Sequence, residues 1–381
     1  MISSLTLGNF KCFRQLNLPL QQFTLLAGLN GMGKSSVIQS LLILRQSFLN
    51  KAFLEDRLDL AGDLADLGTG QDVLLDGAAE DLITIGLAWS GSEAIHPRAL
   101  FQFAYDRTAD RLQFVNRSDH PWIAEASPID AGKYQPFAGD FQYLCAERLG
   151  PRKFLPLVES HARRRDLGGR GEYVLHFLLD YGGELLGEGD PRIIVNADSQ
   201  ALRQQVEAWL QDVSPGAILG MEPVRAADAV IGSFSFKRSG DVPTMSLRPT
   251  NVGFGLSYAL PVIVALLASP PGALVLLENP EAHMHPRGQT RLGQLAARAA
   301  AAGVQVIAET HSDHFMDGVR IDVREGLLDP KDAAFHYFER DGAEAQVISA
   351  EIDKDGVLSD WPAGFFDQRD ENLIRLLAPR G

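Results

Sequence analysis

The chain has 381 residues, 45% of them apolar, so it can bury a substantial core and is not expected to be disordered. Its 35 basic and 49 acidic residues leave a net charge of −14, which excludes attraction of nucleic acid over the whole surface and restricts any such contact to a local basic patch. The two cysteines, Cys12 and Cys145, form neither a disulfide framework nor a metal-type spacing, and the N-terminus has no secretory-signal pattern, so we expect a cytoplasmic protein.

The first elements predicted are two short strands and a helix. "SLTLGNF" and "FTLLAG" indicate strands, and "SSVIQSLLILRQSFL" has apolar residues at helical spacing. Between the second strand and the helix lies Gly28-x-x-x-x-Gly33-Lys34-Ser35, which fits the P-loop pattern G-x-x-x-x-G-K-[ST] in the context that this motif requires. Glycines allow successive backbone N–H groups to surround phosphates at a helix N-terminus, while the lysine reaches the β- and γ-phosphates and the serine holds Mg²⁺. The predicted ATP-binding residues here are Gly28, Asn30, Gly31, Gly33, Lys34, Ser35 and Ser36.

The middle of the chain predicts short strands followed by helices. Residues 51–150 contain strand patterns such as "DLITIGLAW" and "RLQFVNR", whereas "GEYVLHFLLDYG" and "SQALRQQVEAWLQDV" are helical, and no heptad run is long enough for a coiled-coil arm. Residues 249–277 carry no charge, but Pro261 and "SPPG" divide them into a buried helix at 256–268 and a buried strand at 273–277, so no membrane span is predicted.

The last third alternates again between helices and strands. The helix "TRLGQLAARAAAAG" and the strand "VQVIAET" follow the buried pair, and this alternation is typical of a mostly parallel sheet covered by helices on both faces. We therefore expect an α/β fold with an N-terminal antiparallel β subdomain and a helical insertion. The predicted divisions are an N-terminal ATPase lobe at 1–150, a mainly helical insertion at 151–240, a C-terminal ATPase lobe at 241–330 and an extension at 331–381.

Polar residues follow both predicted strands of the C-terminal lobe. Glu278 ends an apolar strand, where a P-loop protein needs an acid for its metal, so Ser35 and Glu278 are the predicted Mg²⁺ ligands. The next strand ends in Glu309 and His311 at the same edge of the sheet, which suggests that His311 senses the γ-phosphate. His283 and His285 form an H-x-H pair that we interpret as a loop cap before Pro286, rather than as metal ligands.

A second glycine-rich segment opens the buried helix. Its residues Asn251, Gly253, Gly255 and Ser257 are here called the glycine-serine helix start, and a helix N-terminus of this kind can bind an anion. Since one nucleotide already has its P-loop, this segment is best explained if it faces the nucleotide of another subunit. The alternative is a glycine-rich turn without a ligand.

Together these motifs resemble a known ATPase class. Asn9-Phe10-Lys11, the P-loop, the glycine-serine helix start, "ENPEAHMHP" and "ETHSD" occur in an order similar to the compact prokaryotic ATPases related to RecF, SMC and the OLD nucleases, the ABC-type AAA ATPases, over residues 1 to about 330. "AERLGPR", "GGRGEYVLHFL" and "DWPAGFFDQ" further resemble a subgroup with a C-terminal domain of unknown function. The resemblance implies head-to-tail homodimers, with ATP between the P-loop of one copy and Gly253–Ser257 of the other.

The sequence departs from that class at two points. The class usually has Asp followed by a catalytic Glu, whereas this chain has Glu278 and then Asn279, and an amide cannot take a proton from water. Hydrolysis would then be slow, or would depend on Glu281 or Glu309. OLD nucleases also append a nuclease domain, for which too few residues follow position 330.

The leading hypothesis is an ATP- and Mg²⁺-dependent dimerising switch that acts in DNA maintenance or phage defence and controls a partner effector. A P-loop small-molecule kinase and a non-hydrolysing nucleotide-gated scaffold are the alternatives. DNA contact would come from the basic patch Arg163, Arg164, Arg165 and Arg170, unless these arginines form an ordinary solvated surface.

Overall fold

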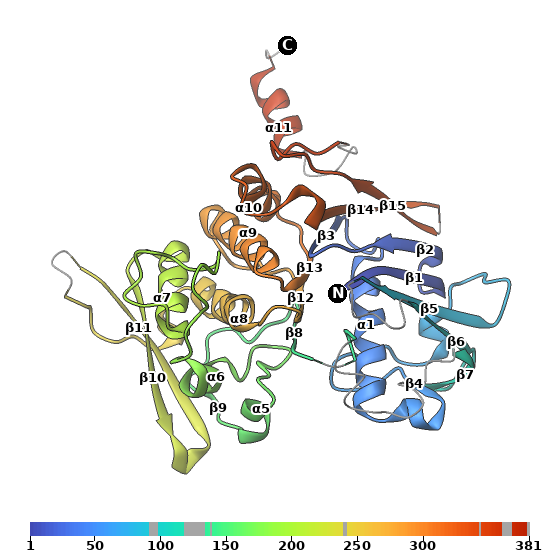
Figure 1. Cartoon of the computed structure of the whole chain (residues 1–381), viewed down its shortest axis with the longest axis horizontal. Coiled ribbons are helices and arrows are strands. Elements are labelled where there is room, and N and C mark those ends of the chain that lie inside the picture. The colour runs from blue at the N-terminus through green and yellow to red at the C-terminus, as the bar shows by residue number, and fades with distance from the viewer. Residues whose placement is uncertain are drawn as a thin grey trace.

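Three β-sheets organise the part of the chain that the computed structural model describes, namely residues 1–90, 98–117, 134–137, 139–238, 242–342, 344–359 and 368–378. Two of the sheets have six strands and the third has three (Figure 1). The six-stranded sheets pack around one helix, α1 (Lys34–Leu49), and the three-stranded sheet lies in the insertion.

The N-terminal sheet is antiparallel, with strand order β2-β1-β5-β6-β7-β4. Alternate residues of its strands are buried, for example Phe13, Leu16 and Leu18 of β2, and they join apolar residues of α1 in one core. The prediction of an N-terminal antiparallel subdomain is therefore confirmed, although β2 was not predicted. Its strands are β1 (Ile2–Phe10), β2 (Phe13–Pro19), β4 (Arg57–Asp59), β5 (Leu82–Trp89), β6 (Arg98–Ala104) and β7 (Arg111–Arg117), with η1 (Ala52–Glu55) and α2 (Gly70–Val73) between them.

The central sheet is mostly parallel, in the order β15-β14-β3-β13-β12-β8, with only β14 and β15 antiparallel. Strand β3 shows why helices cover both faces, because Leu26 packs with α1 whereas Leu25 and Ala27 pack with the core that contains α8, α9 and α10 (Figure 1). The predicted α/β class and its two-sided helical cover are confirmed. The elements are β3 (Phe23–Gly28), β8 (Phe141–Leu144), α8 (Phe254–Ala268), β12 (Leu274–Glu278), α9 (Pro286–Ala301), β13 (Gln305–Glu309) and α10 (Asp313–Arg324).

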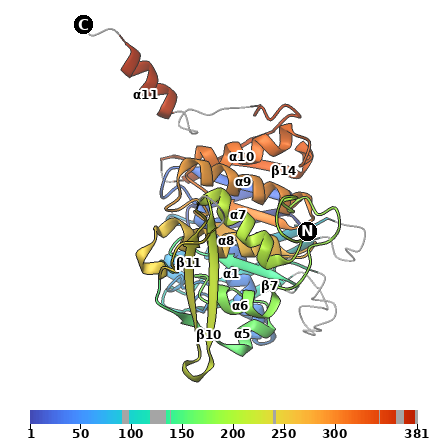
Figure 2. The same ribbon diagram turned by 90° about the vertical axis from the view of Figure 1, so that its left-hand side faces the viewer.

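The insertion between β8 and α8 contains both helices and a β-hairpin. The hairpin β10–β11 projects from the body of the molecule (Figures 1 and 2) and was not predicted, because Gly220 and Pro223 interrupt its strand pattern. The insertion consists of β9 (Leu155–Pro156), α5 (Glu159–Arg163), α6 (Val174–Tyr181), α7 (Leu202–Val213), β10 (Ala217–Val224), η2 (Arg225–Ala227) and β11 (Ala229–Phe236), and η3 (Pro249–Asn251) leads into α8.

The C-terminal segment adds two strands to the central sheet. After η4 (Pro330–Asp332), β14 (Ala333–Asp341) pairs in parallel with β3, and β15 (Glu344–Ala350) pairs with β14. The ATPase sheet thus continues past the division predicted at residue 330. Helix α11 (Gln368–Leu377) extends away from the sheet (Figure 2). Most of the motif "DWPAGFFDQ" lies outside the described residues.

The uncharged stretch forms the buried helix α8 and the buried strand β12, as predicted. In the described ranges, no helix is long and apolar enough to cross a membrane. The longest helices there, α1 and α9, have 16 residues each, so these ranges contain no coiled-coil arm.

Candidate functional site: a P-loop at the carboxyl edge of the central sheet

The P-loop connects β3 to α1 and requires glycine at two positions for steric reasons. Gly28 has φ 135° and Gly33 has φ 104°, a backbone region that side chains disfavour. A Cβ on Gly28 would lie 2.3 Å from the carbonyl oxygen of Phe338, and one on Gly33 would lie 2.6 Å from the ring of Phe13. The loop can therefore pass between β14 and the β1–β2 turn only with these glycines.

Lys34 is buried under the loop, with 3% of its surface exposed. Its Nζ donates to the carbonyl oxygens of Gly28 at 2.9 Å and Leu29 at 2.8 Å, and lies 3.9 Å from a carboxylate oxygen of Glu309. Burial lowers the pKa of Lys34, and the charge of Glu309 opposes that shift. The lysine is thus held inside the loop that would surround the phosphates.

The two predicted Mg²⁺ ligands, Ser35 and Glu278, do not bond to each other, and their role as ligands stays a prediction. The Oγ of Ser35 donates to Glu309, at 3.1 Å and 2.9 Å from the two carboxylate oxygens. Glu278 instead accepts hydrogen bonds from the Tyr143 hydroxyl and from the N–H of Ala146, both at 3.2 Å. Glu278 and Glu309 are register partners on adjacent parallel strands, so both acids lie at one edge of the sheet, with Glu309 next to the P-loop serine.

The carboxyl group of Glu309 has a raised pKa. Burial raises its pKa to about 7, the hydrogen bond from Ser35 opposes the rise, and the nearby charges of Glu278 and Glu281 add to it. Burial also raises the pKa of Glu278 and of Glu281. Three carboxyl groups therefore share a poorly solvated edge and would be stabilised by a cation.

These oxygens fit Mg²⁺. A serine hydroxyl and one or two carboxylates are hard donors, and Mg²⁺ bound with a nucleotide takes its other ligands from phosphates and water. The described residues hold no group of three or more His, Cys, Asp or Glu that could bind a metal by itself. The donor set thus matches a cation shared with phosphates better than a metal held by protein alone.

The loop after β12 holds Asn279 and Glu281 beside His311. The carboxylate of Glu281 accepts the backbone N–H of His311 at 2.9 Å, and its Oε2 is buried without a hydrogen-bond partner. Asn279 adopts φ 44°, and its side-chain oxygen is likewise buried and unpartnered. Burial and the charge of Lys34 lower the pKa of His311. The predicted catalytic residues therefore lie together, although their roles stay predictions.

Arg148 fixes this loop and was not predicted to do so. It is almost completely buried and donates to the carbonyl oxygens of Glu278 at 2.8 Å and Asn279 at 2.6 Å. The sequence offered a signal only in the "AERLGPR" motif, which does not show that the arginine turns toward backbone carbonyls. Arg148 and the hydroxyl of Tyr143 thus tie β8 to the end of β12.

A cavity of about 600 Å³ opens at the P-loop. Asn30, Lys34 and Ser35 line it together with Glu309, whereas Glu278 and Glu281 do not. The further lining residues are Lys11, Cys12, Gly31, Gly33, Ser36, Asp72, Leu74, Leu75, Asp76 and Arg340. Outside the P-loop, the sequence indicated only Glu309 and, through the "NFK" motif, Lys11, because the other lining residues come from segments far apart in the chain.

The glycine-serine helix start opens α8 but does not line this cavity. Gly253 is the N-cap residue of α8 and has open space around it, while a Cβ on Gly255 would lie 3.0 Å from the carbonyl oxygen of His283. Asn251 is exposed, and Ser257 faces a smaller apolar cavity beside Arg152. If this segment binds phosphate, the phosphate is not the one at the P-loop of the same chain.

His285 caps α9, as interpreted from the sequence. Its Nδ1 accepts the backbone N–H of Arg287 at 3.3 Å. His283 instead packs against the rings of Phe254 and Tyr258 at the start of α8.

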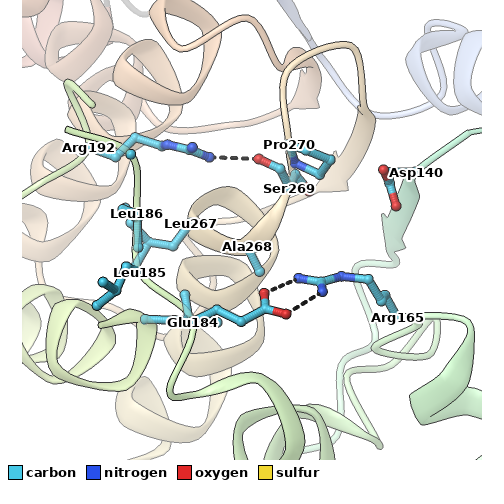
Figure 3. Close-up of a pocket in the computed structure, with 12 residues that line it drawn as sticks. Asp140, Arg165, Glu184, Leu185, Leu186, Arg192, Leu267, Ala268, Ser269 and Pro270 are labelled. Carbon is cyan, nitrogen blue, oxygen red and sulfur yellow. Dashed lines mark hydrogen bonds and ion pairs between the residues drawn. The ribbon is translucent and has the colours of Figure 1, made fainter. Parts of the chain in front are cut away.

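The basic patch is largely neutralised. Arg165 forms a two-pronged pair with Glu184, at 2.8 Å and 2.7 Å, in a cleft between the insertion and the end of α8 (Figure 3). Arg170 lies 3.3 Å from a carboxylate oxygen of Glu147. Arg164 is exposed, and the side chain of Arg163 is outside the described residues. Two of the four predicted DNA-contacting arginines thus already pair with acids.

Comparison with family models places two ATPase segments on this fold. Residues 1–116 match "AAA ATPase domain", and residues 177–317 match "AAA domain, putative AbiEii toxin, Type IV TA system". Residues 328–376 match "Protein of unknown function (DUF3696)", in agreement with the C-terminal domain inferred from the sequence. No curated protein matches the chain.

One solved structure shows a similar fold, and two further SMC heads align less closely. An SMC head bound to the C-winged helix domain of ScpA aligns with a TM-score of 0.55 at 14% identity, covering 93% of this chain and 98% of that one. The SMC head domain from Thermotoga maritima aligns at 0.46 and 13% identity, over 92% and 99% of the two chains. An SMC head from Pyrococcus furiosus, bound to the C-terminal domain of ScpA, aligns at 0.48 and 12%, over 99% of each.

The chain therefore has the fold of an ABC-type AAA ATPase of the RecF and SMC kind, which confirms the resemblance drawn from its motifs. The segment with the P-loop pattern lies between β3 and α1 of this fold.

Proposed function

We propose that this protein is an ATP-dependent switch, in which ATP and Mg²⁺ bind at the P-loop and drive two copies into a head-to-tail dimer. The observation that carries the proposal is the arrangement of Lys34, Ser35 and Glu309 around one cavity at the carboxyl edge of a parallel sheet. Bound Mg²⁺ would neutralise phosphate charge, with Ser35 and the carboxylate of Glu278 as its candidate protein ligands.

The hydrogen bonds of the P-loop support a nucleotide-linked change. Lys34 satisfies two carbonyl oxygens, and Ser35 satisfies Glu309. Phosphates would compete for the lysine, and a cation would compete for both the hydroxyl and the carboxylate. Nucleotide binding would therefore exchange contacts within the loop, and the charge at this edge would change with it.

Slow hydrolysis is part of the proposal. Asn279 follows the strand-end acid where the class has its catalytic Glu, and its amide cannot accept a proton from water. Glu309 is the only one of the three edge carboxylates that lines the described cavity, which makes it the better candidate for a substitute base. Glu281 is the second candidate. A non-hydrolysing scaffold is the second candidate, and Asn279 is the residue that favours it.

The position of the glycine-serine helix start supports dimerisation. Gly253 is exposed and open at the N-terminus of α8, outside the P-loop cavity of its own chain, so its free N–H groups suit the phosphate of a second copy. The similar SMC head is bound to a ScpA domain, which supports the further proposal that this chain controls a partner effector. We place that role in DNA maintenance or phage defence, with the cytoplasm as its location.

Light scattering with and without ATP and Mg²⁺ tests the dimer. The mass should double only when both are present, and Ser257→Arg should prevent the doubling while ATP binding continues, because its bulky cation would obstruct the second copy. Ser199→Arg, which places the same cation on an exposed loop of the insertion, is the matched control and should dimerise normally. A molecular mass that does not change when ATP and Mg²⁺ are added, or normal dimers of Ser257→Arg, would refute the head-to-tail arrangement.

A further inference from the structure

Three cationic side chains line the P-loop cavity, and they differ in the hydrogen bonds that they already make within the protein. Lys34 donates to two carbonyl oxygens, and the Nζ of Lys11 donates to the side-chain oxygen of Gln39 at 2.6 Å. The guanidinium of Arg340 is exposed and makes no hydrogen bond or ion pair with a described residue. An incoming anion would break no protein contact in order to bind it.

Arg340 lies in the cavity because of the fold. It lies two residues after Phe338 in β14. Phe338 pairs in register with Gly28, so β14 runs directly beside β3, the strand that enters the P-loop. The charge of Arg340 also acts on Cys12, another residue of the cavity lining. Burial raises the pKa of the Cys12 thiol, and the positive charge of Arg340 opposes that rise. Arg340 and the β1–β2 turn, which supplies Lys11 and Cys12, thus line the same cavity.

We propose that Arg340 contacts the phosphate chain of the nucleotide held by the P-loop, so that the C-terminal segment forms part of the ATP site. This inference rests on the proposed function. A guanidinium offers several N–H donors in a planar fork, a geometry that suits the oxygens of a phosphate chain. The other charges of the cavity, Asp72, Asp76 and Glu309, repel phosphate, so an unengaged cation at its mouth also favours approach of the ligand.

A contact between Arg340 and the nucleotide would involve the C-terminal segment, which matches a family of unknown function. Residues 328–376 include Arg340, and the hairpin that carries it forms an exposed ion pair with β2, between Arg14 and Glu344 at 2.8 Å. A contact between Arg340 and the nucleotide would restrain β14 and β15 only when the site is filled. The restraint on the C-terminal segment would then depend on whether a nucleotide is bound.

Equilibrium binding of ATP, ADP and adenosine to the full chain tests the contact. Arg340→Ala should raise the Kd for ATP and ADP about tenfold, in line with the loss of one charged hydrogen bond, and should leave adenosine binding unchanged. Arg340→Lys should recover part of the affinity, because it keeps the charge but not the fork. Binding by Arg340→Ala should also depend less on salt concentration than wild-type binding does.

Arg14→Ala is the matched control, since it removes one positive charge beside the same hairpin but outside the cavity. It should bind ATP within about twofold of wild type, because exposed ion pairs contribute little stability. Thermal unfolding without nucleotide should be the same for Arg340→Ala and wild type, since the side chain is exposed. Unchanged ATP affinity and salt dependence in Arg340→Ala would overturn the inference alone, whereas a wild-type chain that binds no ATP would overturn the proposed function itself.

Discussion

Replacing Glu309 by glutamine should stabilise the nucleotide-free protein at alkaline pH. The folded protein raises the pKa of Glu309 from 4.5 to about 7, which corresponds to about 3 kcal/mol against the ionised form. A raised pKa gives stability that is full below pH 4.5 and is lost as the pH rises through 7. Glutamine does not titrate, and its amide oxygen can still accept the hydrogen bond from Ser35, so Glu309→Gln avoids this loss.

The stability gained by Glu309→Gln has an upper limit. Lys34 lies 3.9 Å from the same carboxylate and loses this favourable negative charge in the variant. We expect a gain of about 1–3 kcal/mol at pH 8 and almost none at pH 4.5. For a chain of this length, 3 kcal/mol corresponds to a rise in Tm of about 4 °C. Thermal unfolding measured across this pH range, without nucleotide or divalent cation, supplies the comparison.

The control is Glu147→Gln, which removes the same charge from an exposed side chain and should change the Tm little at any pH. The reasoning would be refuted if Glu309→Gln were no more stable than wild type at pH 8, or if its advantage were equally large at pH 4.5. In the second case the gain would come from packing or hydrogen bonding rather than from titration.

Two further variants test the nucleotide chemistry. Lys34→Ala should abolish ATP binding measured by calorimetry, because it removes the only cation held inside the P-loop of the described structure, and unchanged affinity would show that the P-loop assignment is wrong. Steady-state phosphate release should be low in the wild type, since a positioned base typically contributes about 10²–10⁴ in rate, and Asn279→Glu should raise it. The left-handed backbone at φ 44° favours asparagine, so this variant should also cost on the order of 1 kcal/mol of stability. Brisk wild-type release that Glu281→Gln and Glu309→Gln leave intact, with no gain from Asn279→Glu, would mean that the water is activated elsewhere.

Local patterns were sufficient wherever one segment determines its own structure. The P-loop is a glycine-rich stretch between a strand and a helix, and the buried helix α8 and the buried strands β12 and β13 each consist of an apolar run with glycine or polar residues at its end. The structure forms these elements at the predicted places. The hairpin β10–β11 was missed because its strands are interrupted by glycine and proline, and only pairing between them makes the strands regular.

The sequence by itself determined the class of protein and the residues of the P-loop, because glycines at fixed spacing between a strand and a helix allow few other structures. Only the tertiary structure decided which side chains surround that loop. It pairs Ser35 with Glu309 rather than Glu278 and brings Arg340 to the cavity from the other end of the chain. It also engages Arg165 with Glu184. These contacts depend on strand order and on the path of distant segments, which no local spacing specifies, because parallel strands become neighbours only through crossovers elsewhere in the chain.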